Sequence, residues 1–240
     1  MDYDDHVAAV ERETAAAVQA FRVGDMGTIV PTCPDWTLRD LAKHVGEFTG
    51  LWTHVLCEGT GREKTPYSDI PGRDEEVADW YAGLASRLLG ELRATPPATE
   101  VWTWSEEDKT ARFTARRCAH ELAIHRFDAQ TASGSQQPVD ALLAADGIDE
   151  MFMMIRAWSD EREGSGRSLH LHGAEGDEWV ITLNPDNVDV RFEHGPADLT
   201  LSGAVSDLEL TLLQRPPIGP VAKGGDDEAL AAWYRQFTFG

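Results

Sequence analysis

The amino-acid sequence predicts two domains: an all-α bundle of four to five helices over residues 1–160 and a smaller α+β domain over residues 161–240. In the first part, apolar side chains recur at the spacing of amphipathic helices. A polar stretch over residues 159–167 follows, and after it apolar and polar residues alternate as they do in half-buried strands. Helices first and strands second are typical of an all-α domain joined to an α+β domain.

The helical part contains five amphipathic segments, separated by loops that are rich in proline, glycine or charge. Thr37 and Asp40 form a capping-box pattern at the start of the second segment, where each side chain can bond the other residue's backbone N–H. Pro96 and Pro97 end the third segment, because proline cannot continue a helix. Helices of this length bury their apolar stripes against one another, which predicts a bundle. The five segments cover residues 7–21, 38–55, 77–92, 113–131 and 142–158.

The second part predicts four strands and two short helices. Ser206 and Glu209 form another capping-box pattern, before a short helix that ends near Gln214. A last helix is expected over residues 229–237. The turns between the expected strands contain Gly176, Pro185 and Gly195, residue types that favour turns, which supports the division of this part into separate strands. The strands are expected, as a meander, over residues 169–171, 179–183, 188–192 and 199–201.

Composition excludes several classes of protein. The chain of 240 residues is 42% hydrophobic, so it can form a core, and no apolar run approaches the roughly 20 residues of a membrane helix. A net charge of −21 disfavours nucleic acid and anionic lipid as partners. Residues 1–5 are acidic and do not resemble a signal peptide, and the three cysteines form no CxxC pair. We therefore expect a cytoplasmic protein with no nucleic-acid or membrane partner; its oligomeric state is not predicted.

The fourth helical segment carries an unusual polar stripe on its buried face. Glu121 and His125 are four residues apart and therefore lie one turn apart on one face of a helix, and Asp128 continues the stripe. Cys118 and Leu122 share the same arc and would be buried in a bundle. Burying carboxylates and an imidazole without compensation costs several kcal/mol. A metal ion or a dense hydrogen-bond network would remove that cost.

His44 supplies a third possible metal ligand from the second helical segment. It lies one turn after Leu41 and one turn before Phe48, at the edge of the apolar arc. Helical bundles place metal ligands on facing helices, so His44, Glu121 and His125 are the predicted metal ligands. Two imidazoles and one carboxylate leave tetrahedral zinc with one open position, as in catalytic sites. Another divalent metal, such as Fe(II), accepts the same ligands.

Spacing alone leaves alternatives open. An inward-facing Glu121 can simply bond to a histidine without any metal. Asp128 can orient a metal ligand, or it can accept a hydrogen bond from an N–H group of the neighbouring helix. His120 lies about 140° around the helix from His125, so we interpret it as a surface or packing residue. A pair of histidines at residues 170 and 172 shares one face of a strand and could bind a metal, but an exposed sheet face is the favoured interpretation.

Two longer segments, residues 30–44 (VPTCPDWTLRDLAKH) and 116–129 (RRCAHELAIHRFDA), resemble the mycothiol-dependent maleylpyruvate isomerase family, part of a larger DinB-like group of metal-binding helical bundles. Residues 146–150 (DGIDE) and 198–204 (DLTLSGA) are also similar to that family. The resemblance implies a zinc ion on His44, Glu121 and His125. It also implies a C-terminal domain similar to sterol carrier proteins.

The resemblance further implies mycothiol as a thiol cofactor. A zinc-bound thiol loses its proton, because the cation stabilises thiolate over thiol. The thiolate can then displace a leaving group, or add to a cis double bond that rotates and is restored as trans by elimination. Family members often end a leucine-rich segment in Gly-Arg where this chain has residues 212–215 (LLQR). Arg215 is thereby a candidate catalytic residue that binds an anion, and Gln214 departs from the usual glycine. The alternative for Arg215 is a charge that offsets a helix dipole.

The resulting hypothesis is a zinc-dependent, mycothiol-using thiol transferase or cis–trans isomerase that acts on a small electrophile. Its alternative is a metal-containing binding or regulatory protein that catalyses no reaction. A third alternative is a metal-free bundle in which His44 and Glu121 pair. The sequence does not identify the substrate.

Overall fold

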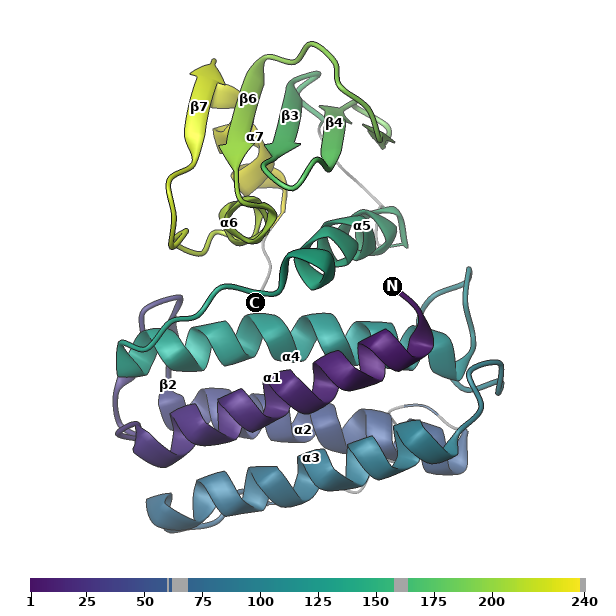
Figure 1. Ribbon diagram of the computed structural model, residues 1–240, viewed down its shortest axis with the longest axis vertical. Helices are drawn as coiled ribbons and strands as arrows, with labels where there is room; N and C mark the ends of the chain where they lie inside the picture. The colour runs from purple at the N-terminus through teal and green to yellow at the C-terminus, as the bar shows by residue number, and fades with distance from the viewer. Residues whose placement is uncertain (60, 62–68, 158–163, 238–240) are drawn as a thin grey trace. The chain divides into compact units, whose positions relative to one another are not determined.

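The computed structural model describes residues 1–59, 61, 69–157 and 164–237 (Figure 1). The chain forms two compact units, Met1–Gln137 and Pro138–Gly240. In the first unit α1 packs against α3 and α4, and α2 packs against the same two helices. The four helices therefore form a closed ring of neighbours, as expected for a bundle. They are α1 (Tyr3–Val23), α2 (Leu38–Glu58), α3 (Val77–Ala94), which follows a short 3₁₀ turn (Asp74–Glu76), and α4 (Ala111–Ser133).

Local sequence signals account for the ends of these helices. The predicted capping box of α2 is present: Asp40 N donates to Thr37 Oγ1 at 3.2 Å, and Thr37 N donates to Asp40 Oδ2 at 2.9 Å. Helices α2 and α4 end at Gly59 and Gly134, with φ of 67° and 68°. Glycine adopts this left-handed conformation without steric cost, which explains the position of both ends.

A short hairpin precedes α2, where the sequence predicts only a loop. Strand β1 (Ile29–Val30) pairs antiparallel with β2 (Cys33–Thr37), and the hairpin contacts both α2 and α4. Its last residue, Thr37, is also the N-cap of α2. The hairpin therefore places Trp36 beside the N-terminal half of α2.

The second unit contains a five-stranded sheet in the order β5-β4-β3-β6-β7. The four predicted strands correspond to β3 through β6, but they do not form a meander, because β6 pairs in parallel with β3. Strand β7 was not predicted, since its sequence, AKGG, has no alternating pattern. The elements are α5 (Ala141–Ala157), β3 (Ser168–Gly173), β4 (Glu178–Leu183), β5 (Val188–Arg191), β6 (Leu199–Gly203), α6 (Val205–Leu212), β7 (Ala222–Gly225) and α7 (Glu228–Gln236).

The helices of this unit pack on one face of the sheet. Helix α6 contacts β3 and β6, and α7 contacts β3 (Figure 1). Leu169 and Leu171 of β3 are fully buried on this face. A methyl group added at Gly173, two residues further along the same strand, would overlap Val205 of α6. Residues 170 and 172 must therefore project from the opposite face.

Helix α5 is grouped with the second unit, although its apolar stripe resembles those of the bundle helices. It packs against α6 and β5, and the Trp179 indole of β4 donates to Asp149 Oδ1 at 2.8 Å. The domain boundary predicted between residues 160 and 161 lies outside the described residues. Among the described residues, no helix has both the length and the apolar character needed to cross a bilayer.

The predicted capping box at Ser206 and Glu209 is wrong. Helix α6 begins at Val205, so Ser206 lies inside its first turn. Ser206 Oγ instead accepts a hydrogen bond of 2.9 Å from the backbone N–H of Val139, at the start of the second unit. A tertiary contact has taken the place of the local cap.

Candidate metal centre

Helices α2 and α4 bring the three predicted ligands together. His44 lies on α2, whereas Glu121 and His125 lie one turn apart on α4. One potential ligand atom from each residue lies within 4.8 Å of the other two. The imidazole rings of His44 and His125 are 4.7 Å apart, centroid to centroid, at an interplanar angle of 78°.

The distances within this cluster suit a metal better than a hydrogen-bonded pair. Nε2 of His44 and Nε2 of His125 each lie 3.4 Å from the same atom, Glu121 Oε1. That separation exceeds the usual 2.7–3.2 Å of a hydrogen bond to nitrogen. Two ligand atoms on tetrahedral zinc, with bonds of about 2.0–2.2 Å, lie about 3.3–3.6 Å apart. Both separations between a histidine nitrogen and Glu121 Oε1 therefore match those of two ligands on one zinc ion.

Arg117 holds the other oxygen of the Glu121 carboxylate. It lies one turn earlier on α4, and its guanidinium donates to Glu121 Oε2. Burial raises the pKa of Glu121, but the Arg117 charge and the two imidazoles outweigh burial and hold the pKa well below its usual range. Glu121 is therefore an ionised carboxylate with Oε1 directed at the histidines.

Asp128 orients His125 from the opposite side of the ring. The Nδ1 atom of His125 lies 2.9 Å from Asp128 Oδ2, and the Asp128 side chain is fully buried. Such a hydrogen bond fixes a metal-binding imidazole so that Nε2 is the ligand atom. Burial lowers the pKa of His125, but the hydrogen bond to Asp128 and the nearby Glu121 carboxylate outweigh burial and raise the pKa to about 9. Cys33 of β2 also contacts Asp128, with Sγ 3.7 Å from Oδ2.

The cluster is buried at His125 and more accessible at His44. The His125 side chain is 5% exposed, whereas that of His44 is 36% exposed. Trp36 of β2 lies beside both rings, with centroid distances of 4.8 Å to His44 and 6.3 Å to His125. A ligand from solvent would therefore approach past His44 and Trp36.

Neither Trp36 nor the contact between Arg117 and Glu121 was predicted from the sequence. Two signals were present, since Arg117 precedes Glu121 by one helical turn and Trp36 directly precedes the capping box of α2. His120 is buried and its ring stacks edge-on to His6 at 5.9 Å, in keeping with a packing role.

Arg215 belongs to the second unit, where it follows α6 and is buried. Its guanidinium Nη1 donates to the Leu213 carbonyl at 2.9 Å. The preceding residue, Gln214, has φ of 62°, a left-handed conformation that glycine favours. Gln214 therefore adopts a backbone conformation that glycine adopts without steric cost. The Gln214 side chain donates to the Phe237 carbonyl at 3.1 Å.

Comparisons with known proteins support the resemblance. A crystal structure of the mycothiol-dependent maleylpyruvate isomerase is 16% identical, covers 93% of each chain and has a TM-score of 0.60. A histidine-to-alanine mutant of that enzyme is 14% identical over the same coverage, with a TM-score of 0.64. These likenesses show the fold. No curated protein matches the sequence. Residues 7–130, more than half of the chain, match the family described as the mycothiol maleylpyruvate isomerase N-terminal domain. The chain therefore belongs to this family.

Proposed function

We propose that this chain is a zinc-dependent enzyme that uses mycothiol to catalyse cis–trans isomerisation or thiol transfer on a small electrophile, with the cofactor's thiolate as the nucleophile. The observation that carries the proposal is the placement of two imidazole Nε2 atoms 3.4 Å from one Glu121 oxygen. Membership of the family and likeness to the mycothiol-dependent isomerase support the choice of thiol and reaction.

The chain's own residues would prepare this site. His44, Glu121 and His125 would hold the ion, which leaves a fourth tetrahedral position for a ligand. When bound, zinc would supply the positive charge that favours the thiolate form of the cofactor. Arg117 occupies Glu121 Oε2, which would leave Oε1 for the ion, and Asp128 occupies His125 Nδ1, which would leave Nε2 for the ion. The partial exposure of His44 gives the thiol a route to the site.

Arg215 stays a predicted catalytic residue. Its proposed role is to bind a substrate carboxylate or the enolate that develops during thiolate addition. Arg215 is buried directly after the left-handed backbone of Gln214, so its position is defined by the fold. Replacement of Arg215 by Gln should then lower kcat or raise KM without changing the zinc content.

The test combines metal content with turnover. Purified protein is analysed by elemental mass spectrometry, and mycothiol-dependent conversion of maleylpyruvate and of other small electrophiles is followed by absorbance. Glu121→Gln, His44→Ala and His125→Ala should each lose one zinc per chain and the activity. His54→Ala, a change at a histidine elsewhere on α2, serves as the matched control and should retain both.

Three other outcomes would overturn parts of the proposal. Full zinc content in all three variants would mean that the ligands are wrong. Zinc without thiol-dependent turnover would favour a binding or regulatory protein. A wild-type chain that takes up no zinc at this cluster would leave a polar network in a metal-free bundle.

A further inference from the structure

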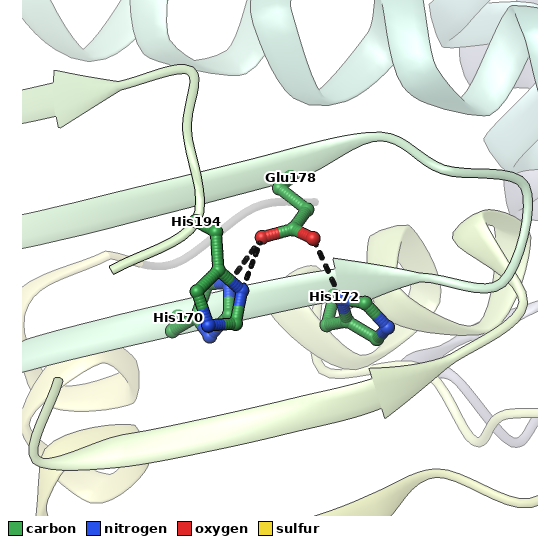
Figure 2. Close-up of side chains that lie close together, drawn as sticks. All are labelled: His170, His172, Glu178 and His194. Carbon is green, nitrogen blue, oxygen red and sulfur yellow. Dashed lines mark hydrogen bonds and ion pairs between the residues drawn. The ribbon is translucent and has the colours of Figure 1, made fainter. Parts of the chain in front are cut away.

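Three histidines and one glutamate converge on the sheet face opposite the helices of the second unit. His170 and His172 lie two residues apart on β3 and therefore share a face, and Glu178 pairs directly with His172 across the antiparallel β3–β4 ladder. His194 comes from the segment that joins β5 to β6. Figure 2 shows the Glu178 carboxylate between the three imidazoles.

The strand order explains why His194 reaches this face. Strands β5 and β6 are separated in the sheet by β4 and β3, so their connection, residues 192–198, must cross both strands. The helices occupy the other face, and the connection crosses this one, where a methyl group at Gly195 would lie 3.3 Å from Val180 Cγ2. The His194 ring stands edge-on to His170, at a centroid distance of 4.9 Å.

The contacts of Glu178 show which atoms converge. Its Oε2 lies 3.0 Å from His170 Nε2 and 2.8 Å from His194 Nδ1, and its Oε1 lies 2.9 Å from His172 Nδ1. One potential ligand atom from each of the four residues lies within 4.8 Å of the other three. An outward movement of about 0.3–0.8 Å per contact would give the ligand separations of tetrahedral zinc.

We propose that His170, His172, Glu178 and His194 bind a divalent transition metal, with zinc as the first choice, at a site separate from the cluster on α2 and α4. Imidazole and carboxylate are ligands that zinc accepts, and four protein ligands form a closed site of the structural kind. The ion would replace three N–H···O hydrogen bonds and fasten the β5–β6 connection to the sheet.

Burial and charge agree with such a site. The His170 side chain is 3% exposed and Glu178 is 20% exposed, so two of the ligands are already held in place. His172 and His194 are 48% and 77% exposed, which leaves an entry path from solvent. The chain's net charge of −21 attracts cations to the surface. The sequence pattern identified only the pair on β3, and it predicted an exposed face, whereas His170 is buried.

The test uses the full chain in which His44→Ala and His125→Ala disrupt the cluster of His44, Glu121 and His125, which is called the first cluster below. Titration of this variant with Zn²⁺, followed by calorimetry, should show one ion bound per chain. Addition of His172→Ala and His194→Ala, the two exposed ligands, should weaken binding at least about 100-fold, because loss of a residue that only orients a ligand already costs roughly 10–100-fold. The same loss is expected from Glu178→Gln, which preserves the size of the side chain.

A matched control and a second readout keep the result clear. His54→Ala in the same background should leave zinc binding unchanged, and zinc should slow amide hydrogen exchange in residues 192–198 only when His172 and His194 are present. Absence of stoichiometric zinc in the chain without the first cluster would overturn the proposal, as would unchanged affinity after loss of His172 and His194. The reciprocal variant, in which only the first cluster remains, tests that cluster separately, so the two sites can fail independently.

Discussion

The pKa of His125 predicts how zinc affinity at the first cluster depends on pH. In the metal-free protein this pKa is about 9, because the hydrogen bond to Asp128 and the nearby Glu121 carboxylate outweigh burial. A histidine binds zinc only as neutral imidazole, so zinc must displace the proton from Nε2. At pH 7, two units below the pKa, this competition weakens the apparent affinity roughly 100-fold. Between pH 7 and 8.5 the affinity should rise about tenfold per pH unit.

The assay measures affinity by competition with a chromophoric chelator of known protonation, in a chain that carries His172→Ala and His194→Ala. Calorimetry in two buffers of different ionisation enthalpy should show about one proton released per zinc at pH 7. In Asp128→Asn the pKa of His125 should fall, so fewer protons are released and the pH dependence flattens. Affinity that does not change between pH 7 and 8.5 in the chain with Asp128 intact would refute the reasoning.

The same pKa fixes the sign of a stability change in the metal-free protein. The pKa of His125 is raised from about 6.5 in the unfolded chain to about 9 in the folded chain. The resulting stabilisation, of order 3 kcal/mol, is fully present below pH 6.5 and is lost as the pH rises through 9. Urea unfolding in the presence of a chelator should therefore show decreasing stability across this range, and a rise would contradict the assignment.

Two further predictions concern stability. Arg126 of α4 donates from Nε to Glu13 Oε2 of α1 at 2.7 Å, and both side chains are buried. Arg126→Met should therefore lower the free energy of unfolding by about 3–5 kcal/mol. Arg22→Met removes an exposed ion pair and should lower it by less than about 1 kcal/mol. Urea unfolding measures both changes. Gly225 has φ of 126°, and a methyl group there would overlap the carbonyl oxygen of Asp198, the residue before β6. Gly225→Ala should lower the free energy of unfolding by about 1–3 kcal/mol. A methyl group at Gly224 would have no neighbour within 4 Å, so Gly224→Ala should leave the free energy of unfolding nearly unchanged in the same measurement.

Much of the first unit follows from local sequence patterns. The apolar stripes predicted its helices, and the capping box at Thr37 predicted where α2 begins. Glu121 and His125 could be placed on one face because four residues make about one helical turn. His44 required the further assumption that α2 faces α4, and the structure brings His44 to 3.4 Å from Glu121.

Tertiary structure decided the features that depend on which elements become neighbours. Helix α5 has a stripe like those of the bundle, but its packing against α6 and β5 groups it with the second unit, which its own periodicity could not show. Glu178 and His194 were not associated with the histidines on β3, because alternation along a strand gives a face but not the strand order. Only the parallel pairing of β3 with β6 carries the β5–β6 connection across that face and brings His194 to Glu178.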